Sequence, residues 1–437
     1  MDDTHKLRLN IYKSLLDLTT TDGINASGAD EAYGCIFGRD SSVTILKLLN
    51  ILKRSSASSY FDSIFFKKII RANLLTLVAL QGSQSNIESG EEPGKFIHEY
   101  RKDNFERLVN RPQPWYVYPD KKLRNYDSID STPMALVAIY KYWQITSDNE
   151  FLIKVLPAVE KGLNWMISYG DMDKDSLLEY ELPLGRKSGG LSVQSWTDSR
   201  DSLLRKSGKF PAYPIAPVEV QGYAWLALRL WADFYMDKKL NFSRTEGFGR
   251  KLLATSKQMK KVFNKKFIIK DNNLYFAAQA LDGYKRKIKT VTGNPLLLLW
   301  ATYKENGQRE SIIEEKYIND LVERSFQTDL FDDDGGIRTM STKSPTFNPG
   351  VNSYHNGSFW PKLNGMAHEG LQNWGFESQA DRLKEATLKP IAYFGTPMEL
   401  YTKDNNGSYQ NYVSNFGKLG CKHQAWTAAA VLDLLTN

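Results

Sequence analysis

The sequence predicts an all-α fold in which helices alternate with long loops around a single site. Apolar residues recur at three- and four-residue spacing in about twelve segments, which is the pattern of amphipathic helices. Strand-like runs are few and short, at 177–183 and 273–281. The residues most suggestive of chemistry fall in long loops, which are usually functional in a compact helical domain. These features favour a toroid of helices with a site at its mouth. A curved solenoid is the alternative, but no repeat period supports it.

The expected helices follow the apolar periodicity from one end of the chain to the other. They cover 6–18, 41–53, 64–81, 132–146, 150–168, 218–236, 247–265, 295–304, 311–325, 362–374, 378–388 and 423–436. Several begin with good caps, such as Ser131-Thr132-Pro133. The long loops lie at 20–40, 82–130, 183–216, 327–360 and 395–422. No Pro/Gly/Ser-rich linker divides the chain, so residues 1–437 are expected to form one domain.

Composition and charge narrow the class of protein. The 437 residues include 57 basic and 50 acidic side chains, giving a net charge of +7, but the two signs are interspersed. The densest basic stretch, 257–270, keeps apolar residues at helical spacing, so its lysines are expected on a solvated face rather than on nucleic acid. The two cysteines cannot form a disulfide framework. With no apolar leader and no segment long enough to span a bilayer, a cytoplasmic protein without nucleic-acid or membrane partners is expected.

Two carboxylates in aromatic and polar surroundings are the leading candidates for catalysis. Asp198 lies in QSWTDSRDS (194–202), and Glu399 lies in PMELYTKDN (397–405). Hydrolysis of a glycosidic bond needs one group to protonate the leaving oxygen and a second to activate water or attack carbon. Trp196 could raise the pKa of Asp198 by excluding water. Asp201 is the alternative acid, and either aspartate could instead cap a following helix.

Seven segments in order resemble the amylo-α-1,6-glucosidase domain of glycogen debranching enzymes and its bacterial relatives. They are GCIFGRDSS (34–42), EEPGKFIHEYR (91–101), YDSIDSTP (126–133), QSWTDSRDS (194–202), APVEVQGYAW (216–225), 335–361 and the segment around Glu399. More distantly, they are similar to trehalase, glucoamylase and mannosylglycerate hydrolase. This resemblance implies an (α/α)6 barrel with a few short strands at its active-site face.

The resemblance also implies roles for individual residues. Asp198 corresponds to the general acid and Glu399 to the general base that activates water, which inverts the anomeric carbon. Arg39 and Asp40 correspond to residues that grip sugar hydroxyls, although an internal ion pair is the alternative for them. The Tyr-His-Asn-Gly run of 354–357, with His355 and Asn356, and Trp360 correspond to a loop that walls the same subsite. The remaining expected sugar contacts are Phe37, Glu99, Asp130, Trp196 and Gln221.

The expected reaction is exo-acting, inverting hydrolysis of an α-glycoside, with an α-glucoside as the first candidate. The chain begins almost at the first barrel helix, and Thr197 and Lys362 depart from the pattern of bacterial relatives. A short oligosaccharide or disaccharide is therefore expected rather than a polymer. Trehalose, another small α-glycoside such as a sugar-acid compatible solute, and a non-catalytic sugar-binding role are the alternatives. No cofactor is expected. No metal is expected either, because the five histidines are scattered and DMDKDS (171–176) lacks the glycine and terminal glutamate of a calcium loop. The sequence leaves the oligomeric state open.

Overall fold

The protein is a closed double ring of helices in a computed structural model. The structure describes residues 3–54, 63–237, 246–305, 307–348, 354–414 and 417–436. The inner ring consists of α2 (Gly38–Arg54), α5 (Ser131–Thr146), α7 (Val218–Met236), α9 (Leu297–Trp300), α11 (Pro361–Asn373) and α13 (Ala425–Thr436). Each packs on the next in this order, and α13 packs on α2. Contact between the last and second helices therefore closes the ring.

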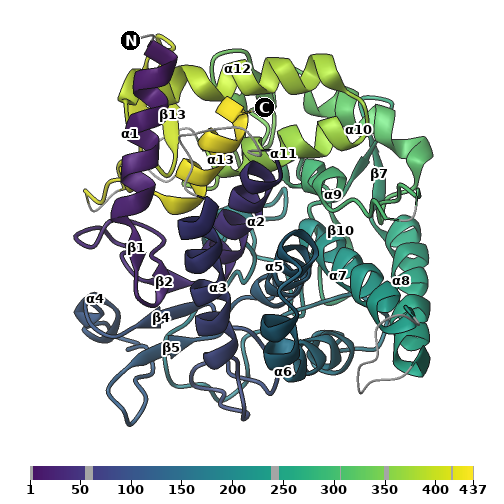
Figure 1. The fold of residues 1–437 in the computed structure, drawn as a ribbon. Helices are drawn as coiled ribbons and strands as arrows, with labels where there is room; N and C mark the ends of the chain where they lie inside the picture. The colour runs from purple at the N-terminus through teal and green to yellow at the C-terminus, as the bar shows by residue number, and fades with distance from the viewer. Residues whose placement is uncertain are drawn as a thin grey trace.

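The outer ring covers the inner one. It consists of α1 (Asp3–Asp17), α3 (Ser63–Ala79), α6 (Asn149–Ser168), α8 (Glu246–Lys266), α10 (Ile318–Ser325) and α12 (Glu377–Phe394). In Figure 1, α1, α12, α10 and α8 lie along the rim, with α13, α11 and α9 inside them. Helix α1 packs on α13, α3 and α6 on α5, α8 on α7, and α12 on α11. This arrangement confirms the predicted (α/α)6 barrel.

The long loops carry small antiparallel sheets and one short helix. The sheets pair β1 (Thr19–Thr20) with β2 (Gly23–Ile24), β7 (Ile268–Asp271) with β8 (Leu274–Ala277), β11 (Phe331–Asp332) with β12 (Gly336–Ile337), and β13 (Tyr401–Lys403) with β14 (Tyr409–Asn411). Two three-stranded sheets have the orders β3–β4–β5 and β10–β9–β6. Their strands are β3 (Ile36–Phe37), β4 (Glu99–Arg101), β5 (Leu123–Asn125), β6 (Ala216–Pro217), β9 (Ala280–Leu281) and β10 (Lys287–Ile288), and α4 (Glu106–Val109) is a single turn.

Most predicted helices occur at the expected places, but three segments differ. The segment 295–304 forms only a 3₁₀ turn, Asn294–Leu296, followed by the four-residue α9. The segment 311–325 is helical only from the 3₁₀ turn Glu315–Tyr317 onward, through α10. Helix α12 continues beyond 388 to Phe394 with Pro390 inside it. The strand expected at 177–183 is absent from the described structure, where Tyr180 forms only an isolated bridge with Ile215.

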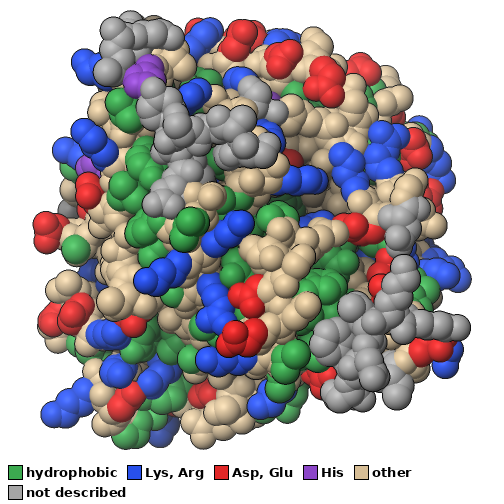
Figure 2. Space-filling view, viewed as in Figure 1, with side chains coloured by type: hydrophobic (Ala, Val, Ile, Leu, Met, Phe, Trp, Pro, Cys, Tyr) green, Lys and Arg blue, Asp and Glu red, His purple; other side chains and the backbone are tan. Residues whose placement is uncertain are grey.

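The surface shows the mixed charge that the sequence suggested. Figure 2 shows basic and acidic side chains side by side over the visible face, with apolar side chains between them. Residues 257–266 of the densest basic stretch lie in α8, where Met259 and Phe263 are buried while Lys257 and Lys261 are exposed. Among the described helices, none combines the length and the hydropathy needed to cross a membrane.

The amino-terminal ends of the six inner helices meet at one place. Residues at or just before these ends are Arg39, Asp40, Asp130, Glu219, Asn294, Trp360 and Gln424. Arg39 Nε donates to Asp130 Oδ2 at 2.8 Å, Asn294 Nδ2 to Glu219 Oε2 at 3.3 Å, and Gln424 Nε2 to Asp40 Oδ1 at 3.0 Å. A helix amino terminus carries roughly half a positive charge and favours nearby anions. The barrel thus provides a surrounding suited to buried carboxylates.

Candidate active site

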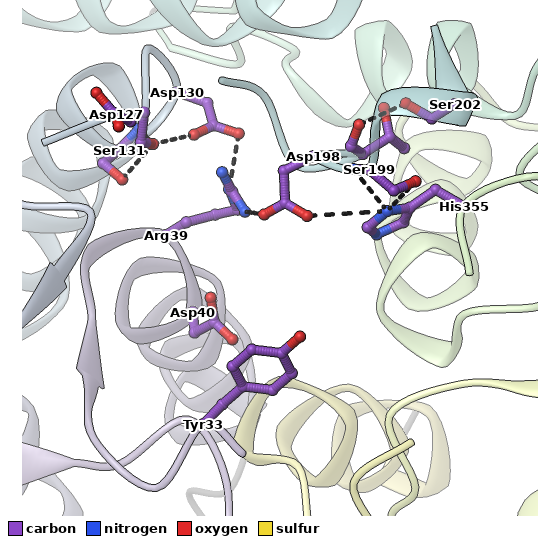
Figure 3. A network of polar contacts seen from close by, with 12 residues as sticks. Tyr33, Arg39, Asp40, Asp127, Asp130, Ser131, Asp198, Ser199, Ser202 and His355 are labelled. Atoms are coloured by element: carbon purple, nitrogen blue, oxygen red, sulfur yellow. Dashed lines mark hydrogen bonds and ion pairs between the residues drawn. The ribbon is translucent and has the colours of Figure 1, made fainter. Parts of the chain in front are cut away.

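Asp198 and Glu399 line the same cavity, although 201 positions separate them in the chain. The lining residues are Tyr33, Phe37, Arg39, Asp40, Trp196, Asp198, Tyr354, His355, Trp360, Glu399, Gln424 and Trp426. In Figure 3, Asp198 lies between Arg39 and His355, while Asp40 and the hydroxyl of Tyr33 face the open space below it. We call this space the inner cavity. It brings together the predicted acid, the predicted base and six of the ten predicted sugar contacts.

Asp198 sits in an environment that raises its pKa above the ordinary value of a carboxyl group. Its side chain is 25% exposed, and its Oδ2 lies 3.4 Å from Arg39 Nη1. Its Oδ1 is 3.8 Å from His355 Nδ1. Burial raises the pKa of Asp198 to about 6, against the opposing effect of the Arg39 guanidinium. A carboxyl group with this pKa can donate a proton to a leaving oxygen in mildly acidic solution.

Glu399 is held at both of its oxygens. The hydroxyl of Tyr354 donates to Oε1, and the backbone N–H of Cys421 donates to Oε2 at 2.9 Å. The backbone of the segment is fixed as well, since Glu399 N donates to Cys421 O and Gln424 N donates to Pro397 O. Burial raises the pKa of Glu399, while Tyr354, Cys421 and Lys418 act to lower it. The side chain is oriented, and three groups favour its carboxylate form.

Arg39 connects Asp198 to the interior of the barrel. Its ion pairs are with Asp130 and Asp198, whereas Asp40 accepts a hydrogen bond from Gln424. Asp130 is fully buried, and the flanking acids raise the pKa of the Arg39 guanidinium despite burial. Burial raises the pKa of Asp40 to about 7. Asp40 can therefore offer a hydroxyl-binding group whose charge varies near neutral pH.

Aromatic rings form one wall of the inner cavity. His355 stacks on Trp360 with ring centroids 4.6 Å apart, and Trp196 meets both rings edge-on at 5.6 and 5.7 Å. Burial and Arg39 lower the pKa of His355 well below its ordinary value, so the imidazole is neutral. Its Nδ1 accepts from the Ser199 N–H at 3.3 Å, which places the ring proton on Nε2. Such a wall suits the apolar face of a sugar ring.

Several buried polar atoms on the cavity-lining residues have no hydrogen-bond partner within the described part of the chain. They are Arg39 Nη2, Trp196 Nε1, His355 Nε2, Gln424 Oε1 and Trp426 Nε1. Buried polar groups are normally paired, and leaving one unpaired costs about 1–3 kcal/mol. Four of the five atoms are donors and one is an acceptor. A ligand rich in hydroxyl groups has the chemistry to pair with them.

Lys362 lies behind this wall, where the sequence suggested only a departure from the family pattern. The side chain is fully buried, with its ammonium 4.2 Å from the ring centroid of Trp196 and 5.5 Å from that of Trp426. Its Nζ has no hydrogen-bond partner among the described residues. Burial and Arg39 lower the pKa of Lys362 to about 7. The lysine therefore packs on the aromatic wall from the side of the protein interior.

A second, larger space adjoins the inner cavity. This outer cavity has a volume of about 500 Å³ and shares Tyr33 and Tyr354 with the inner one. Its other lining residues are Ser199, Arg200, Asp201, Leu204, Thr346, Asn348, Asn356, Tyr412, Ser414, Lys418 and Leu419. Asp201, the alternative acid, lies here, apart from Glu399. Asn356 also lines this space and donates to the backbone oxygens of Asp201 and Thr346.

Three predicted sugar contacts lie outside both cavities. Glu99 accepts from Arg101 and is paired in register with Phe37, so it lies behind the cavity wall. Asp130 supports Arg39. Gln221 accepts from Leu178 N at 2.9 Å and donates to the backbone oxygens of Leu178 and Pro217. Their side chains are bonded to other protein groups. Residues 349–353 of the loop around His355 lie outside the described residues.

Four residues that line the inner cavity were not among the predicted contacts. They are Tyr33, Tyr354, Gln424 and Trp426. Tyr354 belongs to the Tyr-His-Asn-Gly run that the resemblance assigned to the wall of the subsite, although it was not named as a contact. Gln424 and Trp426 lie in the segment that begins the last helix, so the motifs contained a signal for these residues as well. Tyr33 directly precedes the first motif and carried no signal of its own.

The acidic turn at 171–176 brings three carboxylates together. Ligand atoms of Asp171, Asp173 and Asp175 lie within 4.8 Å of one another. Lys285 pairs with Asp173 at 2.8 Å and with Asp175 at 3.0 Å, and Lys266 pairs with Asp175 at 2.7 Å. Two ammonium groups thus supply positive charge to this turn.

Comparison with known proteins points to glycoside hydrolases. Residues 311–427 match the family model of the mannosylglycerate hydrolase MGH1-like glycoside hydrolase domain. A search of curated proteins gave no match. The predicted enzyme class, a glycoside hydrolase, agrees with this family match. The match lies with the mannosylglycerate hydrolase group, which the motifs resembled more distantly, and does not single out the amylo-α-1,6-glucosidase subgroup.

Solved structures share the fold over nearly the whole chain. The GH63 mannosylglycerate hydrolase from Thermus thermophilus in complex with glucose has a TM-score of 0.65 and 14% identity, covering 98% of this chain and 99% of that one. A metal-independent α-mannosidase from Streptococcus pneumoniae, in a non-productive complex with α-1,6-mannobiose, has a TM-score of 0.62 and 12% identity. That match covers 99% of this chain and 93% of the mannosidase.

Proposed function

We propose that this glycoside hydrolase is an exo-acting, inverting α-glycosidase in which Asp198 is the general acid and Glu399 the general base. The observation that carries the proposal is the inner cavity itself. It holds an acid with a raised pKa and an oriented carboxylate, and five buried polar atoms of the residues that line it have no partner among the described residues. In this mechanism Asp198 protonates the glycosidic oxygen while Glu399 removes a proton from the attacking water. Arg39, Asp40 and the aromatic wall hold the sugar.

The substrate we propose is a small α-mannoside whose aglycone carries a carboxylate. The family match and the mannosidase fold support a mannosyl group, and the outer cavity would receive the aglycone. Arg200 and Lys418 line that cavity and offer cations to a carboxylate, and Asp201 is the one acidic side chain among its described lining residues. The α-glucoside expected from the motifs is the second candidate, and the glucose complex of the Thermus enzyme favours keeping it.

The stereochemical course tests the mechanism directly. We expect hydrolysis of an α-mannoside to release the β-anomer first, because water activated by Glu399 attacks the face opposite the leaving group. Proton NMR of the anomeric signals, recorded before mutarotation, measures this. α-Mannosylglycerate, α-1,6-mannobiose, trehalose and isomaltose form the substrate panel. Initial release of the α-anomer would exclude Glu399 as a water-activating base, and preference for a glucoside would replace mannose as the sugar.

The pH dependence tests the assignment of Asp198. Because the general acid must be protonated and the pKa of Asp198 is about 6, we expect kcat/KM for an ordinary glycoside to fall as pH rises through about 6. An ordinary carboxyl group loses its proton near about pH 4, so a raised pKa keeps the general acid protonated and active up to a higher pH. Initial rates at low substrate concentration between pH 4 and 9 give this basic limb. A limb that remains flat to pH 9 would contradict the assignment.

A further inference from the structure

A chain of hydrogen bonds leads from Glu399 to the outer cavity. Tyr354 donates to Glu399 Oε1, and the hydroxyls of Tyr354 and Tyr33 lie 3.0 Å apart. Lys418 Nζ donates to the Tyr33 hydroxyl at 3.1 Å and also lies 4.5 Å from the centroid of the same ring. The links come from three separate loops, and Tyr33 and Tyr354 form part of both cavity walls. The chain therefore crosses the boundary between the two cavities.

The two ends of the chain fix its direction. An ammonium group can only donate hydrogen bonds, and an ionised carboxylate can only accept them. Each tyrosine has one proton to donate. Burial and the charge of Glu399 raise the pKa of Tyr33 and of Tyr354 well above the ordinary value, so both hydroxyls keep that proton. With Tyr354 donating to Glu399, Tyr33 must donate to Tyr354, and its oxygen remains free to accept from Lys418.

In every hydrogen bond of the chain, the donated proton is therefore directed toward Glu399. Hydrogen bonds in a chain of one direction polarise each other, and bonds to an ionised group are stronger than bonds between neutral groups. The arrangement favours the carboxylate form of Glu399. The backbone N–H of Cys421 fixes the second oxygen at 2.9 Å. The side chain is thus oriented from two sides.

We propose that Tyr354, Tyr33 and Lys418 are positioning residues that hold Glu399 as an oriented carboxylate through this directed chain. The inference rests on the proposed role of Glu399 as the base. Asp40, Tyr412 and the thiol of Cys421 respond to the charge of Glu399. Asp198 acts on Tyr33 and Lys418, and Arg107 acts on Lys418. The positive charge of Lys418 lowers the pKa of Glu399 and so stabilises its carboxylate form.

The test uses α-mannosyl fluoride and α-glucosyl fluoride as substrates. Fluoride leaves without needing a proton from Asp198, and it carries no carboxylate for Lys418 to bind. The acidic limb of kcat/KM then no longer depends on proton donation by Asp198, and its displacement between variants reports the ionisation of the base. Fluoride release is measured between pH 3.5 and 8 for the unaltered protein and for Lys418→Met, Tyr33→Phe and the double variant. Urea unfolding of each variant records any structural loss.

We expect Lys418→Met and Tyr33→Phe each to move the acidic limb upward by about half to one pH unit. The chain lowers the pKa of Glu399, so removing a link raises that pKa and protonates the base at higher pH. The double variant should move no further than either single variant, because both changes cut the same chain. Lys418→Arg should restore much of the original limb. A purely structural role would lower stability without moving this midpoint.

Arg107→Met is the matched control. The Arg107 guanidinium lies 5.7 Å from the ring centroid of Tyr33 but donates to the backbone oxygen of Ala32 and not to the hydroxyl. Its removal should leave the acidic limb in place. If Lys418→Met moves the limb and Tyr33→Phe does not, the charge acts through space and the chain is overturned. If neither Lys418→Met nor Tyr33→Phe moves the acidic limb while Glu399→Gln abolishes fluoride release, the positioning role of the chain is wrong but Glu399 can still be the base. If Glu399→Gln retains fluoride release, the proposed function fails as well.

Discussion

Replacing Asp198 by Asn is expected to lower kcat/KM for an ordinary α-mannoside by about 10²–10⁴-fold. The amide keeps the shape of the side chain but cannot protonate the leaving oxygen. With α-mannosyl fluoride the loss should be much smaller, since fluoride departs unprotonated. Initial rates with the two substrates give the ratio that identifies a general acid. An equal loss with both substrates would instead assign Asp198 a role in binding or in folding.

Asp201→Asn is the matched control for this result. Asp201 was the alternative acid in the sequence, and it lines the outer cavity while Asp198 shares the inner cavity with Glu399. We expect Asp201→Asn to reduce kcat/KM for the ordinary glycoside far less than Asp198→Asn does. The reduction should be the same with the fluoride as with the ordinary glycoside. The reverse pattern, in which Asp201→Asn alone spares the fluoride, would transfer the acid to Asp201. Glu399→Gln should reduce both substrates together, because the fluoride still requires an activated water.

Replacing Arg39 by Met is expected to destabilise the folded protein by about 3–5 kcal/mol. The guanidinium pairs with Asp130 at 2.8 Å and with Asp198 at 3.4 Å, and Asp130 is fully buried. Methionine would leave the Asp130 charge without its partner in the interior. Urea unfolding at pH 7, followed by tryptophan fluorescence, measures the change in the free energy of unfolding. A change below about 1 kcal/mol would show that other groups compensate Asp130.

Two further measurements separate charge from geometry at Arg39. Arg39→Lys keeps the positive charge but cannot direct two bonds from a planar group, so a smaller loss of stability is expected. Since Arg39 lowers the pKa of Asp198, Arg39→Met should also raise that pKa. The basic limb of kcat/KM would then move to higher pH in whatever fraction remains folded. A limb that moves to lower pH would contradict the ion pair as the cause.

The helices could be predicted where apolar spacing was regular over many residues. The segment 218–236 has the same bounds in the structure as in the prediction, because its apolar residues continue through five turns. The helix predicted over 295–304 was too long. All four residues of α9 are buried, and a continuous apolar run has no periodicity to mark where a helix ends. Helix α12 was predicted to end at 388, but it continues to Phe394 with Pro390 inside it and packs on α11.

The candidate site was partly visible in the sequence for a related reason. Motifs around Asp198, Glu399 and His355 identified residues that line the inner cavity. Glu99 and Gln221 lie in similar motifs, yet they bond to neighbouring protein groups instead of lining it. No spacing rule separates a side chain at a wall from one behind it. Lys418 was missed because an isolated lysine in a loop resembles an ordinary surface residue until its partner, Tyr33, is known.

Closure of the ring by α13 against α2 has a consequence for synthesis. The site takes Arg39 and Asp40 from the start of the chain, Asp198 from its middle, and Glu399 and Gln424 from near its end. Contacts between residues so distant in sequence form late in folding. A growing chain that has not yet released α13 from the ribosome already contains Asp198 and Arg39, but the helix that the ring needs for closure is missing. The inner cavity is therefore complete only after α13 has packed on α2.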